Sequence, residues 1–187
     1  MTPPAPGPGN GGAEKGLDMT AASPEGLADR VRAIEDELAI RRLILSYGPA
    51  ADAGLTARAA SLWVDDGQYD WDGGKVPYEG RGAIKGMLDG DTHQGLIADG
   101  VAHFAGPPLI DLDADRATAL TYSLIMRHEA GSGRFYLWRV SAARWELERV
   151  GDSWAVRRRE NRLLDETGAG RMLLGRTLEE MFGEERT

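Results

Sequence analysis

The sequence contains no cysteine among its 187 residues. Disulfide bonds, thiolate metal sites and a cysteine nucleophile are therefore excluded. It also lacks any uninterrupted apolar run near the roughly 18 residues that a membrane-spanning helix needs. Its N-terminus has no apolar stretch preceded by positive charge, so no secretion signal is expected. The net charge of −8 has the wrong sign for a general nucleic-acid-binding protein.

The length and composition of the chain suit one soluble domain. Apolar residues make up 42% of the chain, enough for a hydrophobic core at this length. Residues 1–22 are rich in proline and glycine and nearly devoid of large apolar side chains. Such a segment cannot bury enough surface to offset the entropy lost on ordering, so it is predicted to be a disordered tail. We therefore expect a cytoplasmic protein with one domain over residues 23–183, and neither nucleic-acid nor membrane partners.

The first part of the domain reads as helical. Ser23-Pro24-Glu25 is typical of a helix start, and the apolar pattern continues from there to Tyr47. Gly48-Pro49 should kink this helix or end its regular part just before Asp52. Shorter helices are predicted over residues 56–64 and 80–88, with a turn at Asp65-Asp66-Gly67 and a short strand over residues 68–71 between them.

From about residue 101 the pattern changes to that of strands. Segments rich in β-branched, aromatic and aliphatic residues are separated by turn signals, and they predict strands over residues 101–104, 108–112, 117–128, 135–149 and 153–163. An amphipathic helix over residues 170–182 follows. Helices followed by long antiparallel strands indicate an α+β domain whose helices cover one face of a curved sheet. The interior of such a cone is a natural small-molecule pocket.

One acidic residue of the first helix stands out. Val31, Leu38, Leu45 and Asp52 recur every seven positions and so fall along one stripe of the helix. Three of the four are aliphatic, which predicts that this stripe is the buried face. An aspartate there loses hydration at a cost of several kcal/mol unless it is partnered. Asp52 is therefore a candidate functional group, and Tyr47 could bring a phenol near the same space.

Several ordered segments together resemble SnoaL-like proteins of the NTF2-like superfamily. The opening is similar in residues 40–47, 52–54 and 62–66, and the middle in residues 79–84 and His103 at a strand start. The last strand is similar in residues 154–156 and 159–165. The resemblance covers about residues 27–180. It implies an α+β NTF2-like cone, a curved antiparallel sheet wrapped around helices with an internal pocket, generally as a homodimer or homotrimer.

The resemblance also implies candidate site residues. Dehydratase and dehydrochlorinase members use a helix aspartate with a strand histidine, positions that Asp52 and His103 match. Scytalone dehydratase adds a second histidine on the following long strand, where His128 stands. The bile-acid dehydratase has a tyrosine five residues before its aspartate, as Tyr47 is here. Other members are polyketide cyclases, ketosteroid isomerase relatives and non-catalytic dioxygenase small subunits, so fold cannot settle function.

An aspartate–histidine pair in an apolar cone is suited to general-base catalysis. Asp52 would fix the tautomer and direction of the His103 ring and stabilise its charged form, while His128 or Tyr47 would act as the acid. No metal or organic cofactor is required. These residues predict a cofactor-independent lyase or isomerase for a small hydrophobic, aromatic or polycyclic substrate. The alternatives are a polyketide cyclase and a non-catalytic ligand-binding or assembly subunit.

His93 and the basic run at residues 157–159 are expected to contribute less to the site. His93 follows a Gly-Asp turn and is expected at the surface. The basic run at residues 157–159 could suggest an anion site. On a regular strand, however, Arg157 and Arg159 share one face and Arg158 points to the other, so at most one face can line a pocket.

Overall fold

The computed structural model describes residues 24–71 and 77–183, so the predicted tail at residues 1–22 lies outside the described part. Helices form most of the first half, and one helix follows the last strand. They are α1 (Pro24–Asp52), α2 (Thr56–Ala60), α3 (Gly80–Asp89), α4 (Asp91–Asp99) and α5 (Ala169–Phe182). No helix in this part of the chain is long and apolar enough to cross a membrane.

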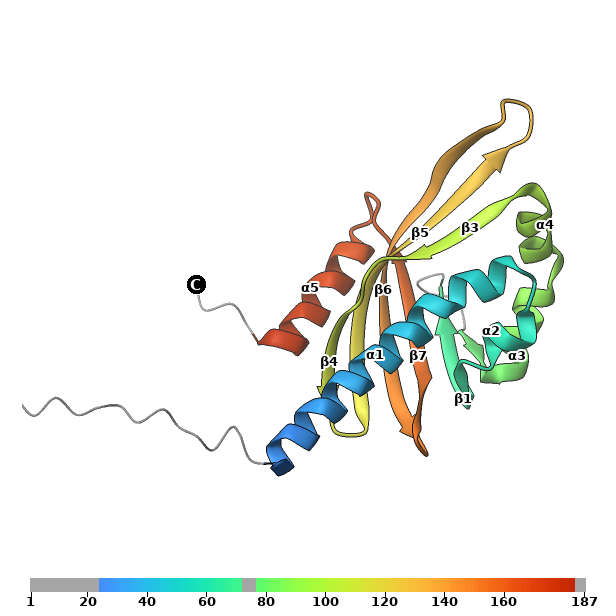
Figure 1. The fold of residues 1–187 in the computed structure, drawn as a ribbon. Coiled ribbons are helices and arrows are strands. Elements are labelled where there is room, and N and C mark those ends of the chain that lie inside the picture. Colours follow the sequence, from blue (N-terminus) through green and yellow to red (C-terminus); the bar gives the residue numbers. More distant parts are fainter. Residues whose placement is uncertain (1–23, 72–76, 184–187) are drawn as a thin grey trace, which may run out of the picture.

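The strands form one sheet in the order β2-β1-β7-β6-β5-β3, and β4 also pairs with β5. Their bounds are β1 (Trp63–Asp70), β2 (Tyr78–Glu79), β3 (Val101–Ala105), β4 (Leu109–Asp113), β5 (Arg116–Glu129), β6 (Arg134–Val150) and β7 (Ser153–Leu163). All pairs are antiparallel except β1 with β7. Figure 1 shows a curved, unclosed sheet with α1 lying across it, which confirms the predicted α+β cone.

The core lies where α1 meets the sheet. Ile40, Ile44 and Ala51 of α1 are fully buried, and they belong to a cluster with Trp63 and Trp145 from the sheet. Ile84 and Leu88 close the same cluster from α3. This packing holds the last turns of α1 against the strands, which positions the residues at its C-terminal end.

The predicted buried face of α1 is wrong for the single chain. Val31, Leu38 and Leu45 are 46%, 47% and 42% exposed, whereas Ile40 and Ile44 are fully buried. Apolar side chains occur on two faces of α1, and periodicity alone cannot tell which face meets the sheet. The apolar stripe formed by Val31, Leu38 and Leu45 therefore faces solvent in the single chain.

Of the two outcomes predicted at Gly48-Pro49, a kink or a helix end, the end is wrong, because α1 continues to Asp52. Proline removes its own backbone donor and crowds the carbonyl group one turn earlier. The helix nevertheless continues, and Ala53 N–H donates to Pro49 O at 3.1 Å. Gly48 has a packing role, since a Cβ on it would overlap the backbone oxygen of His103. Glycine therefore lets β3 cross α1 at close range.

Two smaller differences concern the segment between α1 and β3. Asp65 and Asp66 lie within β1 rather than in a turn after a helix, and α2 ends at Ala60. Helix α4 has no counterpart in the prediction. Its sequence, DTHQGLIAD, contains a glycine and only two large apolar residues, so its helical signal is weak. The strands after residue 101 and the final helix are confirmed to within two residues at their ends.

Candidate active site

Asp52 and His103 are joined by two hydrogen bonds. The backbone N–H of His103 donates to Asp52 Oδ2 at 2.7 Å, and His103 Nδ1 lies 2.5 Å from Asp52 Oδ1. Because a carboxylate accepts, Nδ1 carries the proton and Nε2 is left as the basic nitrogen. Both side chains are largely shielded, with 21% and 14% of their surfaces exposed. The contact fixes both the tautomer and the direction of the imidazole ring.

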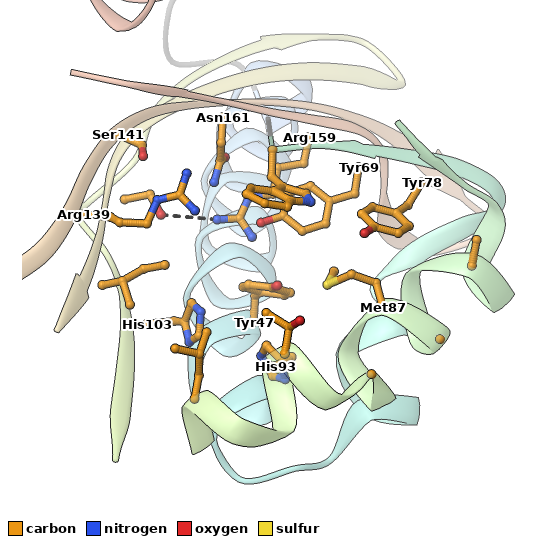
Figure 2. Close-up of a pocket in the computed structure, with 18 of the residues that line it drawn as sticks. Tyr47, Tyr69, Tyr78, Met87, His93, His103, Arg139, Ser141, Arg159 and Asn161 are labelled. Carbon is orange, nitrogen blue, oxygen red and sulfur yellow. Dashed lines mark hydrogen bonds between the residues drawn. The ribbon is translucent and has the colours of Figure 1, made fainter. Parts of the chain in front are cut away.

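A cavity of about 740 Å³ lies beside this pair. His103 lines it, while Asp52 lies behind the ring and does not. Side chains from both the sheet and the helices line the cavity. Figure 2 shows Arg159 and Asn161 on the sheet side and His93 on the helical side. Aromatic and apolar side chains complete the lining, among them Tyr69, Trp71, Tyr78, Met87, Leu96, Ile125 and Trp138.

Tyr47 lies on the cavity wall in the centre of an aromatic cluster. It is 5% exposed, and its ring centroid lies 6.5 Å from that of His103 in an edge-on arrangement. Burial, reinforced by the neighbouring Tyr69, raises the pKa of the Tyr47 phenol well above its usual value near 10. Tyr47 is therefore a neutral hydrogen-bond donor at physiological pH.

Arg159 is a buried cation on the cavity wall, and sequence reasoning missed it. It is 3% exposed, and its guanidinium carbon lies 4.2 Å from the Trp145 ring and 4.4 Å from the Tyr47 ring. Its Nη2 donates to Ser123 Oγ at 3.4 Å, whereas Nε and Nη1 have no partner. Within the described residues no carboxylate forms an ion pair with it. Aromatic faces offset part of the cost of this buried charge, and an anionic ligand would offset more.

A neighbouring arginine on the same strand behaves differently. Arg162 is bidentate to Asp70 at 3.1 and 2.8 Å and also contacts Glu160 at 2.8 Å. Its charge is satisfied by the protein itself. Arg159 lacks such partners, so it has donors free for a ligand, and the unpartnered Oδ1 of Asn161 adds an acceptor nearby in the lining.

The predicted alternation of the basic run is wrong because β7 is irregular there. Val156 pairs with Leu147 and Arg158 with Glu146, which leaves Arg157 without a register partner. This bulge shifts the alternation of side chains by one residue. Arg157 consequently faces outward and pairs with Asp66, while Arg159 points into the cone. A bulge leaves little trace in a sequence, and this explains why Arg159 was not singled out.

His93 is buried rather than at the surface as expected. It is 7% exposed on α4, lines the cavity, and its ring centroid lies 5.6 Å from that of His103. Nδ1 lies 3.1 Å from Leu88 O, so it carries the proton, and the buried Nε2 has no partner. Burial, and then the nearby His103, lower the pKa of His93. His93 came inside because the unpredicted helix α4 closes the helical side of the cavity.

His128 is not brought together with Asp52 and His103. It pairs with Phe135 near the β5–β6 hairpin, and the two ring centroids are 5.0 Å apart. The residue of β5 opposite His103 is Ile125, three positions earlier, and it is Ile125 that lines the cavity. Strand rise therefore carries His128 away from the site. No cluster of three or more histidine or acidic residues suited to a metal ion occurs in residues 24–71 and 77–183.

Comparison with known proteins identifies the fold and the family of the chain. The SnoaL-like domain family matches residues 32–160. An NTF2-like protein with a cystatin-like fold from Novosphingobium aromaticivorans is 44% identical, with a TM-score of 0.78 over 82% of this chain and 97% of that one. No curated protein matches the chain.

Two more distant structures from the same organism share the fold. A proposed scytalone dehydratase is 20% identical, with a TM-score of 0.59 over 74% of this chain and 89% of that one. A proposed aromatic ring hydroxylase is 23% identical, with a TM-score of 0.57 over 71% and 91%. The family match over most of the chain, the 44% identity and the shared cone lead to one conclusion. The protein belongs to the SnoaL-like family of the NTF2-like superfamily.

Proposed function

We propose that the protein is a cofactor-independent lyase or isomerase that removes a proton from a small cyclic or polycyclic substrate. The observation that carries this proposal is the hydrogen-bonded Asp52–His103 pair beside a cavity that also holds the unpaired cation Arg159. The SnoaL-like family includes dehydratases and cyclases, so the proposal lies within its known range.

The base in this reaction is His103. Its Nδ1–H is held by Asp52, so Nε2 accepts the proton of a substrate C–H bond. The ring becomes an imidazolium as it does so, and the adjacent carboxylate stabilises that charge at a largely shielded position. Asp52 does not line the cavity, which suits a residue that orients the base rather than one that touches substrate.

The negative charge left on the substrate needs a partner, and Arg159 supplies it. Its free guanidinium donors can bind the oxygen of an enolate formed when a proton α to a carbonyl is removed. Tyr47, kept neutral by burial, can donate its proton to the same oxygen or to a departing hydroxyl. In a dehydration the C–H electron pair forms the new double bond, the C–O bond breaks, and water leaves.

The test is a panel of cyclic β-hydroxy ketones and aromatic ketones. Water loss is followed by ultraviolet absorbance, and α-proton exchange in deuterium oxide by proton NMR. We expect His103→Gln and Asp52→Asn to lower the rate by about 10²–10⁴-fold, the usual contribution of a positioned base. Arg159→Met should lower it by a similar factor.

His128→Gln is the matched control, because this histidine lies outside the cavity. It should retain the rate of the unaltered protein. If His103→Gln retained that rate, the proposed base would be wrong. If the protein bound members of the panel by calorimetry and turned over none of them, the non-catalytic ligand-binding alternative would replace the proposal.

A further inference from the structure

The first turns of α1 carry an exposed apolar seam. We define the α1 seam as Leu27, Val31, Ile34 and Leu38, which are between 46% and 58% exposed. Their spacing alternates between four and three residues, the a/d pattern of a coiled coil. Figure 1 shows the dark-blue N-terminal end of α1 projecting past the ends of the strands.

Up to Glu35, these turns are open to solvent in the described part of the chain. Every residue from Leu27 to Glu35 is exposed on all sides of the helix. The first contact with the body of the domain is at Asp36, which accepts hydrogen bonds from Arg149 and Trp154. A helix of about three turns is marginal in water by itself. An exposed, contiguous apolar stripe on such a helix is typical of an interaction surface.

We propose that the α1 seam pairs in antiparallel fashion with the α1 seam of a second copy of this chain. The arrangement is self-complementary and closed, as expected for a two-fold dimer. Because each domain body begins beyond Asp36, antiparallel helices place the two bodies at opposite ends of the helix pair.

The charges beside the α1 seam favour this partner and this register. When Val31 packs against Ile34 of the partner subunit, Arg30 lies opposite Glu37 of the partner subunit, and symmetry makes this contact twice. Sliding the helices by one heptad would instead place Glu37 opposite its own copy and introduce repulsion. Flanking charges of this kind select register and orientation in helix pairs.

The test is the oligomeric state of the full-length chain by sedimentation velocity and light scattering. We expect a dimer, and we expect Ile34→Lys to raise its dissociation constant about a hundredfold or more, because each copy then places a charge in an apolar contact. Tyr122→Lys is the matched control, since Tyr122 is 55% exposed on β5 and lies outside the α1 seam. That variant should remain dimeric.

A charge exchange tests the register. Arg30→Glu should weaken the dimer about tenfold. Glu37 also pairs with Arg41 of its own helix, so the compensating variant combines Arg30→Glu, Glu37→Arg and Arg41→Glu, and it should restore the dimer. A chain that is monomeric at all concentrations would overturn the proposal. So would a dimer that Tyr122→Lys dissociates and Ile34→Lys does not, because the interface would then be the sheet. Failure of the triple variant to recover would contradict the antiparallel register.

Discussion

Two parts of α1 contain similar proportions of apolar residues, five of nine in residues 27–35 and seven of thirteen in residues 40–52, and have opposite surroundings. From Ile40 onward, side chains on one face are buried against the sheet, and this part carries Tyr47 and Asp52 of the candidate site. From Leu27 to Glu35 every residue is exposed. The difference shows that burial in α1 is decided by what lies opposite the helix rather than by its own composition.

The boundary between the two parts is a polar contact. The Asp36 carboxylate accepts hydrogen bonds from both terminal nitrogens of Arg149, at 2.9 and 2.7 Å, and from the indole N–H of Trp154, at 2.9 Å. These bonds fix the helix to the β6–β7 end of the sheet. On the N-terminal side of Asp36, residues 27–35 of α1 are all exposed in the described part of the chain.

The largest expected effect on stability comes from Gly48→Ala, in the part of α1 that is buried against the sheet. Its Cβ would overlap the backbone oxygen of His103, so α1 and β3 must separate. We expect a loss of about 3 kcal/mol or more in the free energy of unfolding, measured by urea denaturation. Gly95→Ala in α4 is the control, because a Cβ there meets nothing within 4 Å. Equal stability of the two variants would contradict the close crossing.

Adjacent residues of α1 allow a direct comparison of its faces. Ile44 is fully buried and Leu45 is 42% exposed. We expect Ile44→Ala to cost about 2–4 kcal/mol of unfolding free energy and Leu45→Ala less than about 1 kcal/mol. Chemical denaturation of both variants under the same conditions measures the contrast. A larger loss for Leu45→Ala would mean that the wrong face of α1 has been assigned to the core.

The smallest expected effect is a pH dependence of the unfolding free energy that arises from Asp36. The hydrogen bond from Arg149 is the main reason that the pKa of Asp36 is lowered from its usual value near 3.8. A lowered folded-state pKa means that the unfolded chain binds the proton more readily. The stabilisation is therefore present above about pH 4 and is lost as the pH falls through the folded-state pKa.

Asp36→Asn should reduce the unfolding free energy at pH 7 by about 1 kcal/mol. The difference from the unaltered protein should shrink as the pH falls below about 4, as measured by urea denaturation across a pH series. Asp29→Asn, on an exposed site of the same helix, should change little. A constant difference at all pH values would show that the contact acts through packing rather than charge.

Much of the fold could be predicted because its elements carry strong local patterns. The strands after residue 101 and helix α5 are separated by clear turn signals, and their bounds agree with the structure to within two residues. Helix α4 was missed because glycine and polar residues weaken its pattern. His93 was then placed at the surface, although α4 carries it into the cavity.

The candidate site could be predicted only in part. Asp52 was selected from its position on an apolar stripe of the first helix, and His103 through the family resemblance. The structure brings the two into hydrogen-bond contact, while their catalytic roles stay a prediction. His128 was matched by its position in sequence, yet strand register places it near the hairpin. Arg159 was set aside because regular alternation was assumed where β7 has a bulge.

By itself, the sequence determined the order of the helices and strands apart from α4 and the short β2, the family resemblance, and the residue types of an acid–base pair. Local patterns and residue chemistry carry that information. Only the tertiary structure decided which face of α1 is buried, which arginine of β7 points into the cone, and which histidines share the cavity. Periodicity defines the faces of a helix or strand, but the neighbour that covers a face comes from a distant part of the chain.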